Sequence, residues 1–212
     1  HYKFFKSGYE HDLLICFKDF DKNDPIFSIK ELDNLDFIKY EDHNIYNDYD
    51  WGSYSRISNR YSDRIIFFMN CHSYPIVNNW LKEFVLNYDD NFILGPAGSY
   101  ESITSNWFKG NVSNSFLYSI LYGCLNLINF PLYPNPHLRS NCFMISAKNF
   151  KKLILNQKFK YKKLGTWLNE SGRNGMTKQS KKLKFNIYVI NSDSKKFEIN
   201  NWIDSQTYAL GN

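Results

Sequence analysis

The sequence predicts one α/β domain in which helices flank a mostly parallel sheet. Two continuous apolar runs, Asp12 to Phe17 (DLLICF) and Arg64 to Met69 (RIIFFM), are bounded by charged or polar residues, as is typical of strands buried on both faces. Segments with helical spacing alternate with such runs, and this order favours parallel strands joined by helices. A chain of 212 residues without an internal repeat or linker is long enough for one core. We therefore expect a single domain over residues 1–212.

One helix is predicted before the second strand and one after it. Asp50 can cap a helix that carries Tyr54, Ile57 and Tyr61. The segment Pro75 to Leu86 (PIVNNWLKEFVL) has proline at its start and apolar residues at helical spacing.

The rest of the chain continues this alternation. Phe92 to Leu94 predicts a brief strand, and Cys142 to Ile145 predicts another that leads into a helix from Ala147 to about Leu155. A basic helix near Met176 to Lys184 precedes the last predicted strand, Phe185 to Ile190. In such sheets ligands bind at the carboxyl ends of the strands, so the polar residues that follow each strand form the candidate site.

Aromatic residues make up 18% of the chain, as 18 Phe, 16 Tyr and 5 Trp. The chain is also full of Asn, Lys and Ile, which share AT-rich codons with Phe and Tyr, so a biased genome accounts for the excess. A surface on which rings stack on sugars or bases would account for it too, and composition does not choose between the two.

The four cysteines stand singly, without the spacing of a zinc site. Three of them lie in apolar runs, which predicts small buried side chains in a reducing compartment and a cytoplasmic protein. The longest apolar stretches, such as Phe116 to Ile128, are too short and too polar to span a bilayer. Because the chain begins at His1 without a methionine, we expect it to be a fragment of a longer chain.

The formal net charge of +5 is unevenly distributed. Residues 1–50 hold 12 acids and 6 bases, whereas Lys148 to Lys184 hold 12 bases and one acid, Glu170. Such a run is usually a solvated helical face, and the alternative is a surface that meets phosphates of a nucleotide or of anionic lipid. This segment (148–184) is thus a candidate for peripheral contact with a membrane. Nucleic-acid binding is disfavoured, because Phe150 and Leu153 belong to a core-facing stripe.

Common nucleotide and hydrolase motifs are absent from the sequence. It contains no P-loop, GxGxxG, HExxH or GxSxG, which argues against the corresponding nucleotide-binding, metallopeptidase and serine hydrolase classes. Polar clusters remain in five segments: DWGSYSRISNRY, IIFFMNCHSYP, LGPAGSYES, FPLYPNPHLRSNCFMI and NESGRNGMTKQ.

These segments, in this order, resemble a family of glycosyltransferases encoded in capsule, O-antigen and rhamnan-type polysaccharide gene clusters, with relatives in large DNA viruses. The resemblance runs from HDLLICFK to WIDSQTY. It implies a GT-A fold, in which a nucleotide-sugar-binding half and an acceptor-binding half share one continuous sheet. It also implies transfer of a hexose or deoxyhexose from a nucleotide-diphosphate sugar to a carbohydrate acceptor. The alternative is a member that binds nucleotide or glycan without catalysis.

The resemblance implies that Glu170 is the general base of an inverting transfer. The matching acid in the family takes the proton from the acceptor hydroxyl as that oxygen attacks the anomeric carbon. The family often has a second acid where Ser171 stands, and a single carboxylate disfavours hydrolysis by a carboxylate pair. A helix-capping role next to Ser171 and Gly172 is the alternative for Glu170.

The donor site implied by the resemblance consists of Lys18, Asp50, Gly52, Tyr54, Asn70, His72, Arg139 and Arg173. In GT-A enzymes a DxD motif that holds Mn²⁺ or Mg²⁺ follows the strand matched by IIFFM, and here Asn70, Cys71 and His72 stand there. Neutral asparagine suits a hard cation poorly, whereas His72 can coordinate Mn²⁺ or form hydrogen bonds, so a divalent metal remains open. Without a metal, Arg139 and Arg173 are the candidates to neutralise the diphosphate.

Several of these residues have plain structural alternatives. Asp50 can be an N-cap, and Arg139 or Arg173 can be an ordinary surface or ion-paired arginine. The acceptor is expected to contact Ser99, Glu101 and His137. The glycines of GPAGSYES let the backbone approach a ligand closely, but a tight loop between sheet and helix explains them equally well.

Overall fold

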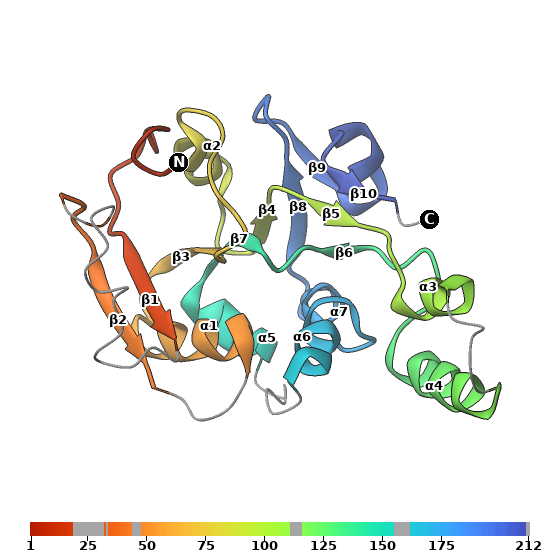
Figure 1. Cartoon of the computed structure of the whole chain (residues 1–212). Coiled ribbons are helices and arrows are strands. Elements are labelled where there is room, and N and C mark those ends of the chain that lie inside the picture. Colours follow the sequence, from red (N-terminus) through yellow and green to blue (C-terminus); the bar gives the residue numbers. More distant parts are fainter. Residues whose placement is uncertain (19–31, 33, 44–47, 111–115, 155–161, 211–212) are drawn as a thin grey trace.

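The computed structural model describes residues 1–18, 32, 34–43, 48–110, 116–154 and 162–210 (Figure 1). The elements are β1 (Leu14–Lys18), β2 (Ile38–Asp42), α1 (Tyr49–Arg60), β3 (Ile65–Met69), α2 (Trp80–Asn87), β4 (Phe92–Gly95), β5 (Gly98–Ser99), α3 (Ile103–Gly110), α4 (Phe116–Asn129), β6 (His137–Leu138), β7 (Cys142–Ser146), α5 (Ala147–Ile154), α6 (Lys162–Ser171), α7 (Met176–Lys182), β8 (Asn186–Ile190), β9 (Lys196–Glu198), η3 (Ile199–Ser205) and β10 (Tyr208–Ala209). The α/β prediction is confirmed, and β1, β3, β4, β7 and β8 lie within two residues of the strands expected from sequence. Residue 155, where the helix after β7 was expected to end, lies outside the described residues.

The central sheet is mixed, with strand order β3-β7-β4-β8-β9. Strands β3, β4 and β8 share one direction, and β7 and β9 run against them. Among the neighbouring pairs of this sheet in the described chain, only β4 and β8 are parallel. The prediction of a mostly parallel sheet is therefore wrong for these strands.

The connection between β4 and β7 explains the difference. β4 ends at Gly95, and the chain passes through β5, α3, α4 and β6 before β7 begins at Cys142 (Figure 1). Cys142 pairs with Met69, the last residue of β3, so β7 enters the sheet at the edge where β3 and β4 end. A parallel strand needs a crossover that returns the chain to the opposite edge, and this connection makes none.

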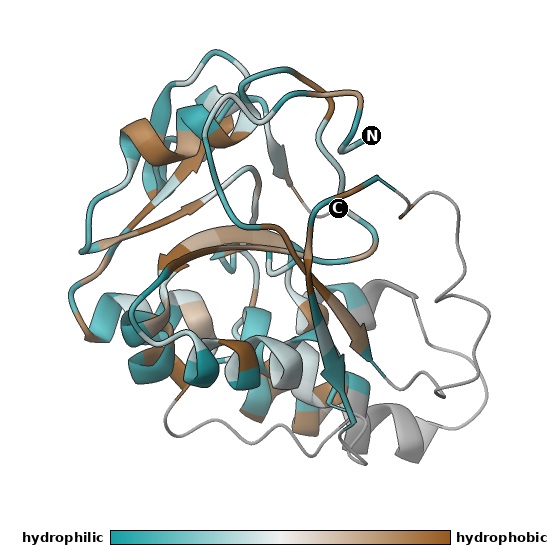
Figure 2. Ribbon diagram, turned by 90° about the vertical axis from the view of Figure 1, so that its left-hand side faces the viewer, coloured by the Kyte–Doolittle hydropathy of each residue, from teal (hydrophilic) through white to brown (hydrophobic). Residues whose placement is uncertain are grey.

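Side chains alternate between the two faces of the central sheet, as the pleat of a strand requires. On one face the strands contribute Phe68, Ile93, Phe143, Ile145, Ile187 and Val189 to a core shared with α1, α5 and α7. On the other face, Leu94, Met144 and Ile190 pack against Leu81 and Phe84 of α2. Figure 2 shows the apolar strands crossing the middle of the molecule.

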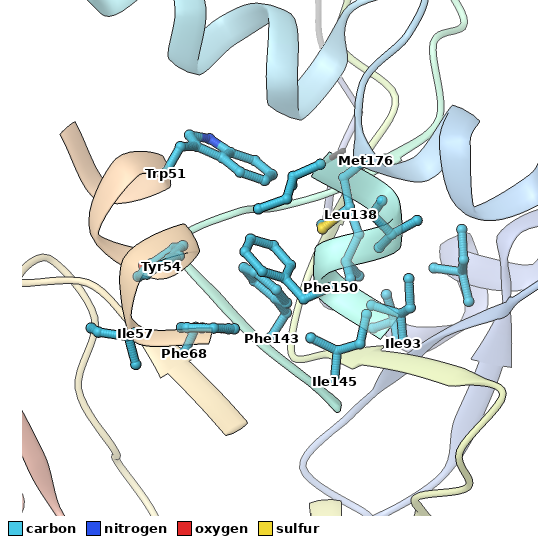
Figure 3. Packing of buried hydrophobic residues seen from close by; sticks show 14 of the residues in the cluster. Trp51, Tyr54, Ile57, Phe68, Ile93, Leu138, Phe143, Ile145, Phe150 and Met176 are labelled. Atoms are coloured by element: carbon cyan, nitrogen blue, oxygen red, sulfur yellow. The ribbon is translucent and has the colours of Figure 1, made fainter. Parts of the chain in front are cut away.

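Aromatic rings fill the centre of the larger core. Phe143 of β7 and Phe150 of α5 lie between the side chains of α1 and those of β4 (Figure 3), with their ring centroids 5.8 Å apart. Trp51 stacks on Phe150 at 6.0 Å. Burial of one such side chain stabilises a fold by about 1.5–3 kcal/mol, so this cluster fixes α1 and α5 against the sheet.

Two smaller sheets accompany the central one. Strands β1 and β2 form a parallel pair, and β10-β5-β6 form a three-stranded sheet. The expectation of one continuous sheet is thus not met in the described residues, where hydrogen bonding divides the strands into three groups.

The two predicted helices differ from expectation at their starts. The N-cap residue of α1 is Asp48, so Asp50 lies in the first turn and the N-cap alternative for Asp50 is wrong. α2 begins at Trp80 and not at Pro75, because Asn79 before it has the left-handed backbone angle φ 62° and interrupts a helix that would start earlier.

The cysteines divide by position. Cys142 is buried in β7 as predicted, whereas Cys71, in the turn after β3, and Cys124, on α4, are exposed. Neighbouring apolar residues therefore did not guarantee burial, because a helix in an apolar run still presents one side to solvent. In the parts of the chain that the structure describes, no helix has both the length and the apolarity of a membrane span.

Candidate functional site

Polar side chains from six parts of the chain lie along or next to the edge where β3 and β4 end and β7 begins. We call this group the polar track, and its members are Lys18, Asp50, Asn70, Ser73, Ser99, Glu101, His137, Arg139, Ser140, Asn141 and Glu170. It contains eight of the predicted site residues. The expectation that ligand-binding groups follow strand ends is thus consistent with the arrangement.

One arginine joins two carboxylates at the centre of the track. Nη1 of Arg139 lies 3.1 Å from Oε2 of Glu101, and its Nε lies 3.3 Å from Oε1 of Glu170. The side chain of Glu170 is only 15% exposed, whereas those of Arg139 and Glu101 are 40% and 37% exposed. Glu170 is thus the sheltered acid of this cluster and Glu101 the open one.

Short strand pairing brings Glu101 and Arg139 together although 38 residues separate them. Ser99 of β5 lies opposite His137 of β6 in an antiparallel register. Beyond this pair the two chains run in opposite directions, so that Arg139 lies next to Ala97 and Glu101 lies near Asn135. The long side chains of Arg139 and Glu101 therefore bridge the distance along the strands. Ser99 completes the contact, because its hydroxyl donates to Oε2 of Glu101 at 3.2 Å.

Glu170 lies near the end of α6 and is fixed there by a backbone donor. The N–H of Ser140 donates to Oε1 of Glu170 at 2.9 Å, so this oxygen has both Ser140 and Arg139 as partners. Its Oε2 has no hydrogen-bond partner among the described residues. A carboxylate held through one oxygen keeps the other for a ligand.

The chain turns sharply after α6, and the turn requires glycine. A Cβ on Gly172 would lie 2.5 Å from the carbonyl oxygen of Leu168, and a Cβ on Gly175 would lie about 3 Å from three carbonyl oxygens of α6. These glycines let α7 begin against the end of α6, and Thr177 of α7 in turn accepts the N–H of Leu138 at 2.8 Å. The segment NESGRNGMT therefore positions Glu170 beside β6.

A second part of the track lies where β3 ends. Nδ2 of Asn70 donates to Asp50 at 3.3 Å, and Oδ1 of Asn70 accepts the hydroxyl of Ser73 and the N–H of His72, each at 3.1 Å. Nδ2 of Asn141 donates to the Ser73 hydroxyl at 3.1 Å. Because Asn141 follows Ser140, this part is continuous with the Glu170 cluster.

Lys18 connects the track with a network of buried charged side chains next to α1. Its Nζ donates to the carbonyl oxygen of Tyr49 at 2.6 Å and to the carboxylate of Asp48. Arg56 bridges Asp48 and Asp42 through contacts of 2.6–2.7 Å, and both carboxylates are almost fully buried.

The network holds its carboxylates in the ionised form. Burial alone would raise the pKa values of Asp42 and Asp48, but the hydrogen bonds from Arg56, with further hydrogen bonds from Ser53 and Lys18, outweigh it and lower both pKa values. The same contacts raise the pKa of Arg56 despite its burial. Sequence reasoning missed this network, since nothing in the spacing of an acid at 42, an acid at 48 and a base at 56 distinguishes it from a solvated surface.

Three residues that were predicted for the donor site lie outside the track. Tyr54 is 6% exposed and its ring packs 4.4 Å from that of Phe68, inside the larger core. A Cβ on Gly52 would lie 1.9 Å from the Asp48 carboxylate, so this glycine makes room for the network. Arg173 is exposed and donates through Nε and Nη2 to the carbonyl oxygen of Leu127 near the end of α4.

His72 borders the track but is exposed, and the hydrogen bond described for it is that of its backbone N–H with Asn70. A metal site is not formed among the described residues, where no group of three or more His, Cys, Asp or Glu side chains is placed to hold an ion. The amide of Asn70 is also already engaged by Asp50, Ser73 and His72. The described residues at the DxD position therefore do not fit a divalent cation.

Two surface pockets lie away from the track. One of about 310 Å³ is lined by Tyr2, Lys3, Lys6, Ser7 and Leu35, and one of about 250 Å³ lies against β8 and the start of η3. Neither pocket is lined by residues from the edge where β3 and β4 end, and neither is lined by a cluster of acids. We therefore take the track as the candidate site.

Three members of the track, Ser73, Ser140 and Asn141, were not assigned a role from sequence, although they lie in the segments on which the expected resemblance is based. No known protein family, curated protein or solved structure is detectably similar to this chain. The function of this chain is therefore inferred from the residues of the track.

Proposed function

We propose that this chain is an inverting glycosyltransferase that moves a sugar from a nucleotide diphosphate to a carbohydrate acceptor, with Glu170 as the general base. The observation that supports it is the state of Glu170, which is held through Oε1 by Ser140 and Arg139 while Oε2 has no partner in the described chain. A base must be fixed in place and must still have a lone pair to offer, and this arrangement provides both.

In the proposed reaction Oε2 of Glu170 takes the proton of an acceptor hydroxyl. The hydroxyl oxygen forms a bond to the anomeric carbon from the side opposite the diphosphate, and the carbon–oxygen bond to the diphosphate breaks with its electron pair on the leaving oxygen. Positive groups near that oxygen stabilise the charge that develops. Arg139 and Lys18 are the cations of the track and are assigned this role.

The track divides naturally into two ends under this proposal. Lys18, Asp50 and Asn70 lie where β1 and β3 end, the position expected for the donor in a GT-A fold. Ser99 and Glu101 lie on the other side of Glu170 with His137, and their oxygens and ring nitrogen suit the hydroxyls of the acceptor. The shared direction of β3, β4 and β8 supports a GT-A arrangement, because it gathers their carboxyl ends at one edge.

A binding module without catalysis is the second candidate, and one observation favours it. Both cations of the track are already ion-paired, Lys18 with Asp48 and Arg139 with Glu101 and Glu170. A diphosphate would have to compete with these carboxylates, whereas a neutral glycan would not.

A thermal-shift screen against UDP-glucose, dTDP-rhamnose and GDP-mannose, each with and without Mn²⁺, separates the two candidates. Saturable stabilisation by one donor is expected for the transferase, because a ligand that binds the folded state raises its stability by mass action. Binding of cellobiose or maltose with no response to any donor would instead favour the glycan-binding module.

Contact with anionic lipid through segment 148–184 remains a further proposal. Lys148, Lys163, Lys181 and Lys184 are exposed on α5, α6, α7 and the turn after α7, and residues 155–161 of the segment lie outside the described residues. Sedimentation with phosphatidylserine vesicles at low and high salt would test it, since such attraction is screened by salt.

A further inference from the structure

His137 is buried beside Glu170 with one ring nitrogen fixed by the backbone. The residue is 4% exposed, and Nδ1 of its ring lies 2.8 Å from the carbonyl oxygen of Asn135. A carbonyl oxygen only accepts hydrogen bonds, so Nδ1 must carry the proton. Nε2 has no hydrogen-bond partner among the described residues.

The tautomer follows from this contact. In a neutral imidazole only one nitrogen is protonated, so a ring whose Nδ1 is the donor has an unprotonated Nε2. Burial lowers the pKa of His137 below its ordinary value, and the carboxylates of Glu170 and Glu101, which act in the opposite direction, do not reverse this. The ring is therefore neutral at pH 7.

Charged groups from three elements surround this ring. Arg139 lies just after β6, Glu101 lies just after β5, and Glu170 comes from α6. Helix α7, which also packs on β6, contributes the neutral Thr177 at Leu138. A protonated His137 would thus stand between two carboxylates as a hydrogen-bond donor.

Asn135 connects the ring to the helix that carries Glu170. Its carbonyl oxygen fixes the tautomer of His137, and its Nδ2 donates to the carbonyl oxygen of Ser171 at 2.7 Å. Asn135 is fully buried, so both contacts are held in place.

We propose that His137 binds a hydroxyl of the carbohydrate acceptor through its unprotonated Nε2, so that acceptor binding requires the neutral ring and weakens at low pH. This inference rests on the proposed function and adds to it the tautomer through which His137 binds and the pH dependence of acceptor binding. The hydroxyl that His137 binds differs from the attacking one, because a hydroxyl has a single proton and Glu170 takes that of the attacking oxygen. His137 is in this role a binding residue.

Nuclear magnetic resonance of protein labelled with ¹⁵N in its histidine rings tests the tautomer without any activity. The chain has five histidines, and the His137 signals are assigned by their loss in His137→Gln. We expect a protonated Nδ1 and an unprotonated Nε2 at pH 7, with the Nε2 signal shifting when cellobiose or maltose is added. A protonated Nε2, or an Nε2 signal that does not respond to a saccharide that the protein binds, would overturn the inference.

Binding of the same saccharide as a function of pH completes the test. The wild type should lose affinity as the pH falls through the lowered pKa of His137, below the value of about 6.5 at which histidine ordinarily titrates. His137→Ala should weaken binding by roughly tenfold at pH 7, as the loss of one hydrogen bond predicts. His137→Gln, whose carbonyl can accept but cannot titrate, should restore part of the affinity and remove the pH dependence.

His11→Gln is the matched control, because His11 is exposed before β1, at the end opposite Lys18. It should bind as the wild type does at every pH. A second outcome concerns the acceptor role alone. If Nε2 is unprotonated and the protein binds donors, but saccharide binding has the same pH dependence in wild type and His137→Gln, the acceptor role of His137 is overturned. Failure to bind any donor or saccharide would overturn the proposed function and the acceptor role together.

Discussion

The backbone N–H of Ser140 donates to Oε1 of Glu170 across 2.9 Å, joining the end of α6 to the segment that leads into β7. Ser140 stands between Arg139, which contacts the same oxygen, and Asn141, which contacts Ser73. Three consecutive residues therefore connect the acid cluster with the polar groups at the end of β3. Small shifts of this segment would move both parts of the track at once.

Glu170→Gln should reduce sugar transfer by at least about a hundredfold while donor binding is kept. Glutamine can still accept the N–H of Ser140, but its amide is not a base, and a general base contributes roughly 10² to 10⁴ in rate. Turnover is measured with the donor identified by thermal shift. Glu198→Gln, a neutralisation on β9 outside the track, is the control, and equal turnover by both variants would remove Glu170 from the proposed role.

Gly52→Ala should destabilise the fold by about 2 kcal/mol, since the added methyl group would stand 1.9 Å from the Asp48 carboxylate and displace it from Lys18 and Arg56. Chemical denaturation measures the change. Asn59→Ala, at an exposed position of the same helix, should cost little or stabilise. Wild-type stability in Gly52→Ala would show that Asp48 can move aside freely.

The wild type should be more stable to unfolding than Asp48→Asn at pH 7, and this difference in stability should disappear in acid. The pKa of Asp48 is lowered in the folded state, so its contribution is present above the unfolded pKa of about 4 and is lost as the pH falls through the lower folded value. Melting temperatures of both proteins between pH 7 and pH 2 measure this. A difference that stayed constant with pH would mean that the ion pairs of Asp48 are not its source.

Tyr54→Phe should leave donor binding unchanged and should stabilise the fold by up to about 1 kcal/mol. The hydroxyl of Tyr54 is buried without a hydrogen-bond partner among the described residues, and removal of such a group relieves a desolvation cost. Burial and the nearby Asp50 also raise the pKa of this phenol well above its ordinary value, so it does not ionise. Loss of donor affinity in this variant would return Tyr54 to the donor site.

The sequence predicted the strongest strands because their apolar runs are local signals. β3, β4, β7 and β8 each lie in an apolar run, and their predicted bounds are within two residues of the observed ones. The direction of β7 was not predictable in this way, since it depends on where the chain travels between Gly95 and Cys142. β5 and β6 are two residues long and give no periodicity at all.

The same distinction applies to the site. Glu101, Arg139 and Glu170 were each singled out from polar segments, but their mutual contact depends on the pairing of β5 with β6 and was not foreseen. Arg173 and Arg139 were both predicted for the donor site, but Arg173 donates to the carbonyl oxygen of Leu127 near the end of α4. An arginine near a strand end is a local pattern, whereas its partner is set by tertiary packing.

The antiparallel entry of β7 has a consequence for how this protein can change. Because β4 leaves the central sheet and β7 re-enters it at the same edge, the excursion between Gly95 and Cys142 begins and ends at adjacent points of the sheet. That excursion carries Ser99, Glu101, His137 and Arg139, while Glu170 and the donor end of the track belong to the rest of the chain. The excursion is also bound to the C-terminal part of the chain, through the pairing of β5 with β10 and the contacts of Leu138 with Thr177 and of Asn135 with Ser171. A new acceptor specificity could therefore arise through side chains of the excursion that leave these contacts in place.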